Sequence, residues 1–409
     1  MSATRRERTP VPAGYFTLWT TVALDLVGFG IVVPILGRYA ERFGANGFEV
    51  GLLFASYSLA QLVCAPLLGR WSDRIGRKPV IVVSLVGTAV GSIVSGLAGA
   101  LPILFLGRII DGASGGSLSV AQAAVADIAR PDDRARLVGM MGAAFGVGFV
   151  LGPAIGGLSA LGGPHIPFFV AGAIAGANAI AAIVRLPETR RPEERVAIDV
   201  DASPETTTHR HGGVSTSVTL RRLAIVGFVS TLAFTAFEST FSLFGDARFG
   251  LTESSAAAVF LGVGLVLVAM QGGVYAELVE RVGVGTVFRG SLVVTAAGLF
   301  CLAAATTWPV LIVALVLLSA GQGCASPSIT TIVTERAGAH ERGAALGFQQ
   351  SAYAVARVVG PPIAGLLFDR VGVPSPSIAG GALFVVAAVL VVAWGLHRTT
   401  ETTDPALAR

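Results

Sequence analysis

Twelve apolar stretches, each about as long as a membrane-spanning helix, dominate this chain of 409 residues. A helix needs roughly 20 mainly apolar residues to cross about 30 Å of hydrocarbon, and in lipid it must satisfy its own backbone polar groups. We therefore expect an all-α membrane protein with twelve transmembrane helices. The expected spans are residues 14–36, 50–69, 79–98, 102–124, 137–160, 166–185, 221–244, 255–276, 287–306, 309–333, 343–367 and 376–396.

The composition supports a membrane protein and argues against several other classes. Hydrophobic residues make up 53% of the chain and charged residues only 13%, which leaves too little polar surface for a soluble protein of this size. The net charge of +4 does not indicate nucleic-acid binding, because the inner loops of membrane proteins carry excess arginine. The three cysteines lie inside apolar stretches, without the spacing of a disulfide framework or a metal site. We expect no cofactor and no metal.

The apolar stretches form two sets of six, which predicts two six-helix bundles at residues 1–186 and 221–409. Residues 187–220 between them are rich in Pro, Glu, Arg, Thr and Ser, and cannot bury enough apolar surface to fold. We expect a cytoplasmic linker there, in which His209 and His211 are solvated and bind no metal. Arg5-Arg6 before the first stretch could suggest a secretion signal, but that stretch is too long for one and leads into further spans.

The two sets also resemble each other in sequence. Residues 127–157 run parallel to residues 335–365 at a constant offset of 208, so that Gly152-Pro153 corresponds to Gly360-Pro361. A parallel repeat of this kind is typical of transporters whose binding site lies between two similar halves. From the two Gly-Pro copies we expect spans five and eleven to meet.

One hydrophilic break, residues 69–79, holds four cations and one carboxylate between two apolar stretches. We call it the basic segment and expect it to form a tight loop at a membrane surface. Lys and Arg are retained on the cytoplasmic side of a membrane, and counting spans from this loop places 23 of the 29 Lys and Arg, and both termini, in the cytoplasm. The outer loops then hold only Arg38, Arg42, Arg248 and Arg370.

Asp25 is the first candidate for a transport site. It lies eleven residues after Gly14, and a rise of about 1.5 Å per residue puts it near the centre of the bilayer. A carboxylate at that depth is costly and marks a functional site by default, so we expect it to bind a proton or a cationic substrate. The alternative is a structural carboxylate satisfied by hydroxyl groups such as those of Thr20 or Thr21.

Four further charges lie inside spans. Arg108 and Asp111 are three residues apart on one helical face. They form either a purely structural ion pair or a pair that opens during transport so that Asp111 can take up a proton. Glu238 and Arg357 are candidates for proton coupling or substrate contact, and the alternative is that they pair with each other.

Several sequence patterns resemble those of the major facilitator superfamily, and together they cover residues 25–365. The basic segment has the spacing Gly-x-x-x-Asp-Arg-x-Gly-Arg-Lys, which is similar to the family's signature between spans two and three. The fourth span resembles the family motif whose arginine is associated with proton transfer, although Asp111 stands where a neutral polar residue is often found. The fifth span matches Gly-x-x-x-Gly-Pro-x-x-Gly-Gly, typical of drug/proton antiporters, at Gly148, Gly152, Pro153, Gly156 and Gly157. The first span resembles the opening of tetracycline-type exporters.

This resemblance implies the major facilitator fold, with two pseudo-symmetric bundles, and a secondary active transporter that exports amphipathic small molecules or drugs in exchange for protons by alternating access. Asp25 would carry the coupling, and Arg108 with Asp111 would tune it. The basic segment would act as a gate latch that holds the cytoplasmic side shut. The gating residues implied are Gly69, Asp73, Arg74, Gly76, Arg77 and Lys78.

Other functions use part of the same pattern. A proton-coupled symporter that imports a small metabolite would have the same fold, whereas a receptor or assembly partner would not need charges within its spans. An enzyme is disfavoured because no catalytic triad or metal cluster sits at one depth. The sequence also has no nucleotide-binding loop, so we do not expect ATP to be the energy source. We expect a monomer in the inner (plasma) membrane whose partners are a small-molecule substrate, protons and lipid.

Overall fold

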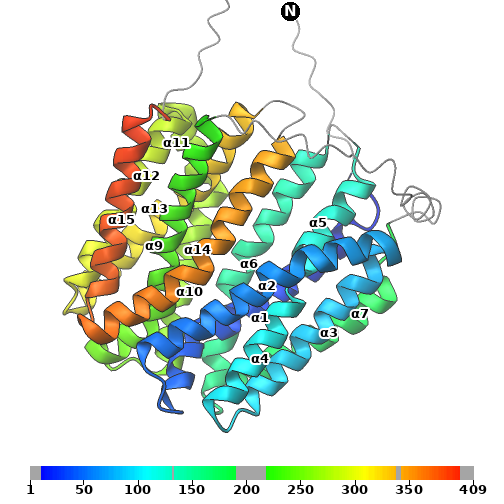
Figure 1. Cartoon of the computed structure of the whole chain (residues 1–409), viewed down its shortest axis with the longest axis horizontal. Helices are drawn as coiled ribbons and strands as arrows, with labels where there is room; N and C mark the ends of the chain where they lie inside the picture. Colours follow the sequence, from blue (N-terminus) through cyan, green and yellow to red (C-terminus); the bar gives the residue numbers. More distant parts are fainter. Residues whose placement is uncertain (1–10, 131–132, 190–217, 338–341, 397–409) are drawn as a thin grey trace, which may run out of the picture.

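The computed structural model describes residues 11–130, 133–189, 218–337 and 342–396 as a bundle of long helices without strands (Figure 1). Among these residues, twelve helical segments are long and apolar enough to cross a membrane, which confirms the predicted fold class. The linker expected at 187–220, with His209 and His211, lies almost entirely outside the described residues, so the expected boundaries of the two bundles stay a prediction.

The helices follow the expected spans closely at most of their ends. The first half contains α1 (Tyr15–Glu41), α2 (Gly47–Ile75), α3 (Arg77–Gly96), α4 (Leu101–Ser114), α5 (Ser117–Ile128), α6 (Arg134–Ala160) and α7 (Ile166–Arg185). The second half contains α9 (Val218–Phe249), α10 (Glu253–Ala269), the π-helix η1 (Met270–Val274), α11 (Tyr275–Val282), α12 (Val284–Ala303), α13 (Trp308–Arg336), α14 (Arg342–Arg370) and α15 (Ser375–Ala393).

Two expected spans are not continuous α-helices. The fourth is broken between α4 and α5 at Gly115-Gly116, where the Gln61 side chain of α2 donates a hydrogen bond of 2.9 Å to the carbonyl of Gly115. The eighth contains η1, whose wider turns are often found at functional sites. Neither irregularity changes the hydropathy of its segment, so apolar length alone could not reveal them.

The expectation that the whole basic segment is a loop was wrong. Helix α2 continues to Ile75, α3 begins at Arg77, and only Gly76 lies between them, with a φ of 112° that favours glycine. Pro79 falls in the first turn of α3, where a missing N–H is tolerated. The charged residues are therefore held on two helix ends in fixed directions.

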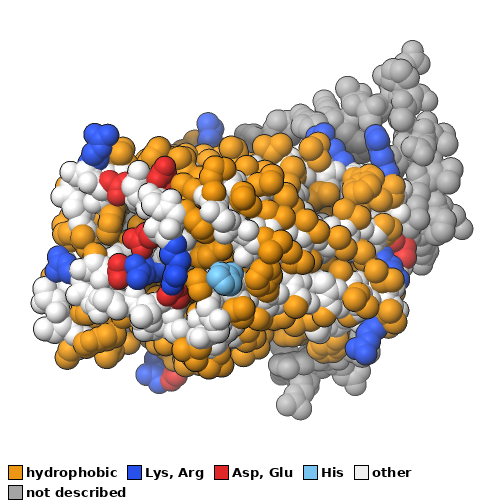
Figure 2. All heavy atoms as spheres, turned by 90° about the horizontal axis from the view of Figure 1, so that it is seen from below, with side chains coloured by type: hydrophobic (Ala, Val, Ile, Leu, Met, Phe, Trp, Pro, Cys, Tyr) orange, Lys and Arg blue, Asp and Glu red, His pale blue; other side chains and the backbone are white. Residues whose placement is uncertain are grey.

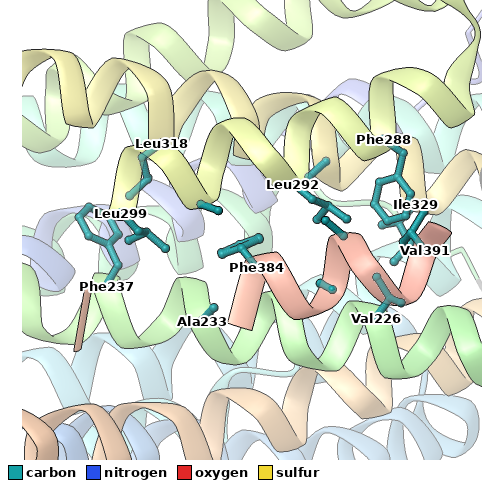
Figure 3. Packing of buried hydrophobic residues seen from close by; sticks show 14 of the residues in the cluster. Val226, Ala233, Phe237, Phe288, Leu292, Leu299, Leu318, Ile329, Phe384 and Val391 are labelled. Atoms are coloured by element: carbon teal, nitrogen blue, oxygen red, sulfur yellow. The ribbon is translucent and has the colours of Figure 1, made fainter. Parts of the chain in front are cut away.

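Each half is built around its own buried apolar residues. The largest cluster lies in the second half, where Phe237 of α9 packs with Leu299 of α12 and Leu318 of α13, and Phe384 of α15 fills the space beside them (Figure 3). Two further clusters fill the first half, and one of them also includes Leu243 of α9. Helices α3, α7, α12 and α15 carry many exposed apolar side chains, as expected for surfaces that face lipid.

The two halves meet mainly where α2 packs on α14 and α6 packs on α10, with smaller contacts of α1 with α9 and α10 and of α2 with α9. Within the described residues, the main neighbours of α6 are α1 and α10, and those of α14 are α9 and α2. The expectation that spans five and eleven (α6 and α14) meet was therefore wrong. A sequence repeat shows which helices are alike, and here each copy packs against the first helix of its own half and the second helix of the other half, not against the other copy.

Helix α6 approaches α1 so closely that only glycine fits at their crossing. A methyl group added at Gly152 would lie 2.5 Å from the Cα atom of Gly30, and one added at Gly148 would lie 2.7 Å from the carbonyl oxygen of Leu26. Small residues at such crossings allow helix backbones to touch in a membrane, where burial of apolar side chains between helices gains little. The glycines of the antiporter motif thus serve first to join α6 to α1.

We predict that Gly152→Ala destabilises the protein, because the backbone of α1 cannot yield to the added methyl group and overpacking typically costs about 1–3 kcal/mol. Gly142→Ala on the same helix is the matched control, since nothing lies within 4 Å of its new methyl group. Thermal unfolding of the purified protein in detergent should show a lower midpoint for Gly152→Ala and an unchanged or higher one for Gly142→Ala. Equal midpoints would contradict this packing.

Candidate functional site

The carboxylate of Asp25 accepts a short hydrogen bond from the hydroxyl of Ser117, at the start of α5. Its side chain is partly exposed. The Thr20 hydroxyl donates instead to the carbonyl of Phe16 at 2.7 Å. Sequence reasoning did not single out Ser117, although its place directly after the Gly115-Gly116 break was a usable signal.

Arg108 and Asp111 form a buried ion pair of 2.7 Å, with residue exposures of 3% and 8%. The side chain of Thr88 on α3 also lies near Asp111, and the guanidinium of Arg108 lies 4.4 Å from the centre of the Tyr57 ring. A charge out of water must be paired or coordinated, and an arginine over a tyrosine face gains further electrostatic stabilisation. The guanidinium is thus held by groups from two helices, although its Nε atom is buried without a hydrogen-bond partner.

Helix α4 reaches this position because of a glycine. A methyl group at Gly112 would lie 2.2 Å from the carbonyl oxygen of Tyr57, so α2 and α4 touch there through their backbones. The contact sets the Tyr57 ring beneath Arg108 and beside Phe29 of α1, whose ring centre is 5.6 Å away. Asp25, Tyr57, Arg108 and Asp111 therefore form one polar cluster in the first half of the chain.

Glu238 and Arg357 do not form the ion pair that was the alternative to a role in coupling or substrate contact. Arg357 is close enough to interact electrostatically with Glu238 and with Tyr57, but within the described part of the chain neither charged side chain makes an ion pair or a hydrogen bond. Arg357 is exposed and Glu238 is partly exposed. Glu238 and Arg357 are therefore not engaged in an ion pair, whereas Arg108 and Asp111 are paired with each other.

The basic segment is organised around Arg77. Its guanidinium pairs with Asp73 at 2.7 Å and with Asp127 of α5 at 2.9 Å, and it donates to the Ser72 hydroxyl at 2.7 Å. The carboxylate of Glu188 accepts hydrogen bonds from the backbone N–H groups of Arg77, at 3.0 Å, and Lys78, at 3.3 Å. These contacts all join residues of the first half or of the short segment directly after it.

The other gating candidates face away from this network. Arg70 and Arg74 are exposed and Lys78 is partly exposed. Gly69 has no atom within 4 Å of where a side chain would begin. In the fifth span, Gly156 packs on α1, Gly157 lies against Ala257 of α10, and Pro153 is buried.

We call the end of the bundle that carries the basic segment the basic end, and the end with the turns 42–46, 250–252 and 371–374 the opposite end. Among the described residues, three polar contacts join the two halves at the opposite end. Arg38 pairs with Asp246 at 2.6 Å and Arg42 with Glu253 at 2.7 Å. Seen from below (Figure 2), acidic and basic side chains lie beside one another on the left of the molecule, amid a largely hydrophobic surface.

The third contact is a helix cap supplied from the other half. The carboxylate of Asp369, near the end of α14, accepts hydrogen bonds from the N–H groups of Gly47 (2.9 Å) and Phe48 (2.8 Å) at the start of α2. A carboxylate at a helix N-terminus satisfies unpaired N–H groups and complements the helix dipole. Asp369 thereby holds α2 against α14.

Asp369 belongs to a second copy of the pattern in the basic segment, which sequence reasoning missed. Residues 69–76 and 365–372 both read Gly-x-x-x-Asp-Arg-(Ile/Val)-Gly, and both end α2 or α14 at a glycine with positive φ. Asp73 and Asp369 therefore occupy matching positions near the ends of two helices that cross each other. A search for the pattern itself would have found the second copy, which does not follow the offset of 208.

Helices α2 and α14 touch at the opposite end and separate toward the basic end (Figure 1). A methyl group at Gly51 would lie 2.3 Å from the carbonyl oxygen of Pro361, and one at Gly365 would lie 1.9 Å from that of Gly47. Gly69 and Gly347 lie five helical turns away on the same faces, yet neither has an atom within 4 Å. The halves are thus closed at the opposite end and apart at the basic end.

A bundle of twelve membrane-spanning helices with charges between two halves is the form of a multi-pass transporter. The sequence model of the Major Facilitator Superfamily matches residues 18–277 and 223–408. The chain is 32% identical to "Tetracycline resistance protein, class E" of Escherichia coli over 383 residues, covering 90% of this chain and 92% of that protein. It belongs to the Major Facilitator Superfamily, and it is a membrane transporter, not an enzyme.

Other known proteins agree with this assignment. The chain is 29% identical to "Multidrug resistance protein 1" of Bacillus subtilis (strain 168), covering 92% of this chain and 95% of that protein. The crystal structure of the human organic anion transporter MFSD10 (TETRAN) shares the fold with a TM-score of 0.69 at 24% identity, covering 94% of this chain and all of that chain. A bacterial homolog of the human lysosomal transporter Spinster, in an inward-facing and occupied conformation, gives a TM-score of 0.71 at 15% identity and covers 94% of this chain and 95% of that chain.

We predict that Asp369→Asn shifts the protein away from the conformation described, because the cap on α2 loses its charge. A charged cap contributes about 1 kcal/mol, which corresponds to about a fivefold change in the ratio of conformations. Electron–electron resonance between spin labels at Arg70 on α2 and Phe348 on α14 should show more of the short distances that mark a closed basic end. Glu277→Gln, which removes an exposed charge paired only within α11, should leave the distribution unchanged; an unchanged distribution in Asp369→Asn would refute the cap's role.

Proposed function

We propose that this transporter exports amphipathic small molecules in exchange for protons, by alternating access between the two halves. The observation that carries the proposal is Asp25, a partly exposed carboxylate in the middle of a membrane-spanning helix, bonded to Ser117 and beside the Arg108–Asp111 pair. A carboxylate at that depth is costly to keep charged and marks an ion or substrate pathway. A proton and a cationic or polar cargo would compete for it.

In the proposed cycle, Asp25 binds a proton when the site faces the outside and gives it up when the site faces the cytoplasm. Ser117 holds the carboxylate toward α5 and stabilises its charged form, since a hydroxyl donor favours the acceptor that carries charge. Arg108 is already paired with Asp111. Its positive charge therefore does not hold Asp25 permanently in the charged form. Cargo binding to the deprotonated site and protonation of the empty site would then be mutually exclusive.

The orientation follows from the distribution of Lys and Arg. We place the basic end in the cytoplasm, with both termini, in the inner (plasma) membrane of the cell. The conformation described then faces inward, closed at the outside by Asp369, Arg38 and Arg42. Residues 1–186 and 221–409 would move as two bundles within a monomer, joined by a linker at 187–220.

The gating role of the basic segment is part of this proposal. With the basic end apart, Arg77 engages Asp73 and Asp127 within the first half. On closure of that end, Asp73, which matches Asp369 in the repeated pattern, would meet the start of α14 and act as the latch. Gly69 and Gly76 would allow the two helix ends to approach.

The names of the relatives support the choice of cargo. Proteins named for tetracycline resistance and multidrug resistance match this chain over about nine-tenths of its length. We therefore propose drug-like amphipathic compounds as the cargo and tetracycline as the first to try. Fold alone does not identify a substrate, so a panel of such compounds is needed.

We predict that Asp25→Asn abolishes exchange driven by a pH gradient. Everted membrane vesicles with an acidic interior should accumulate tetracycline, or another member of the panel, when they contain the unaltered protein, and accumulation should collapse on addition of an uncoupler. Asp25→Asn should lower the gradient-driven rate by at least roughly tenfold, since the variant has no acid to titrate. Counterflow of the same compound without a gradient should persist.

Two controls sharpen this experiment. Glu277→Gln changes an exposed carboxylate on α11 and should transport normally. Ser117→Ala keeps the carboxylate but removes its donor, so it should move the pH dependence of transport without abolishing it. Gradient-driven exchange that survives unchanged in Asp25→Asn would rule out the proposed role, and accumulation only with an alkaline interior would indicate import.

A further inference from the structure

Arg357 is an exposed arginine in the middle of a membrane-spanning helix. The apolar residues Val355 and Val359 on α14 are 43% and 39% exposed and belong to a stripe that faces outward. Arg357 is two residues from each, which places it about 200° around the helix, on the side that meets the other half. Its electrostatic interactions with Tyr57 of α2 and Glu238 of α9 agree with that direction.

Glu238 lies on a similar inward stripe of α9. Thr231, Phe234 and Glu238 are partly exposed at helical spacing, and the residues on either side of Phe234 and Glu238 are buried. Ile225, which is 47% exposed, points to nearly the reverse side of the helix. Glu238 therefore borders the space between the halves and does not face lipid.

The two charges are separated along the helix axes. Helices α9 and α14 run in the same direction, and their contacts match Gly227 with Tyr353 and Thr235 with Gly360. This register sets Arg357 near the level of Thr231. Glu238 then lies further toward the opposite end by about 10 Å along the axis, at about 1.5 Å per residue, which explains why no direct ion pair forms.

The two halves of the chain thus treat their charges differently. In the first half, Asp25 has Ser117, and Arg108 has both Asp111 and the Tyr57 ring. In the second half, no described residue forms an ion pair or hydrogen bond with Glu238 or Arg357. An unpaired charge within a span is costly and marks a site for a ligand of opposite charge. Here one acidic and one basic side chain border the space between the halves at two separate levels.

Aromatic side chains lie between and beside these charges. The Tyr57 ring packs at a tilt against that of Phe29 and interacts electrostatically with Arg357. Phe234 is partly exposed between the levels of Arg357 and Glu238, on the stripe that carries Glu238. A flat apolar scaffold placed between the charges would therefore contact aromatic rings.

We propose that Glu238 and Arg357 bind the two ends of an amphoteric substrate, a molecule with a protonated amine and an acidic group at opposite ends of an aromatic scaffold. This inference rests on the proposed function, because it assigns the cargo of the same central site. Arg357 forms the paired hydrogen bonds that guanidinium makes with carboxylate, and Glu238 receives the ammonium group. A purely cationic molecule meets the repulsion of Arg357 and a purely anionic one that of Glu238, so specificity comes from both signs.

The test uses the full-length protein in lipid nanodiscs and a series of three compounds on one scaffold. Ciprofloxacin carries an ammonium and a carboxylate, its methyl ester keeps only the ammonium, and its N-acetyl derivative keeps only the carboxylate. We expect ciprofloxacin to bind roughly tenfold or more tightly than either derivative, since each derivative leaves one protein charge without a partner. Equal affinity for all three, or no saturable binding of ciprofloxacin, would overturn the inference.

Two variants assign the ends of the substrate. Glu238→Gln should weaken ciprofloxacin and the ester while sparing the N-acetyl derivative, and Arg357→Gln should weaken ciprofloxacin and the N-acetyl derivative while sparing the ester. Glu277→Gln and Arg281→Gln, which change an exposed pair on α11, are the matched controls and should change nothing. A uniform loss with all three compounds would mean that the variants only disturb packing, and the inference would be wrong.

The same variants separate this inference from the proposed exchange. Binding is measured without a pH gradient, so the result on charge selectivity does not depend on whether transport is coupled to protons. If the selectivity holds but everted vesicles show no pH-driven flux, the amphoteric site survives and the antiport proposal fails. If pH-driven flux depends on Asp25 but not on the charges of the cargo, antiport survives and the amphoteric site is wrong.

Discussion

Contact between helix backbones is the constraint on which this structure depends. In a bilayer the burial of apolar side chains between helices gains little over their exposure to lipid, so association relies on close packing and on polar contacts. Glycines provide the closeness here: Gly152 brings α6 to α1, Gly112 brings α4 to α2, and Gly51 brings α2 to α14. The first two contacts stay inside one half and hold the polar cluster in place. The third joins the halves, and it is present at one end only.

That placement determines how the charged groups can be used. The α2–α4 contact sets Tyr57 under Arg108, and the break after α4 brings Ser117 to Asp25. The first half therefore carries a polar cluster whose side chains have partners, and our proposal assigns the exchanged proton to it. The second half carries Glu238 and Arg357 at separate levels, without partners among the described residues. Under the two proposals above, the proton would bind in the first half, and the charged ends of the cargo would be recognised in the second half.

The sequence alone predicted the fold class, the twelve spans to within about six residues at their ends, and the presence of charges within the spans. It could do so because apolar length and the cost of burying charge are local properties of a chain. It could not predict the break at Gly115-Gly116 or the π-helix at residues 270–274, since neither alters hydropathy. It paired α6 with α14 because their sequences are alike, but likeness does not determine contact. Partners such as Ser117 and Tyr57 depend on how helices cross, which no single-helix pattern records.

The pattern that ends α2 and α14 bears on the energetics of the whole cycle. In the proposed cycle, each of the two conformations is closed by an aspartate from this pattern that caps the start of a helix in the other half. The free energies of the two closing contacts are then similar, and they largely cancel in the free-energy difference between the conformations. An equilibrium poised near unity can be tipped by a ligand with only a modest preference for one conformation. Because the same eight-residue sequence would close both conformations, a weakly bound substrate could reverse the side on which this membrane protein opens. Neither conformation would be so stable that the protein could not leave it.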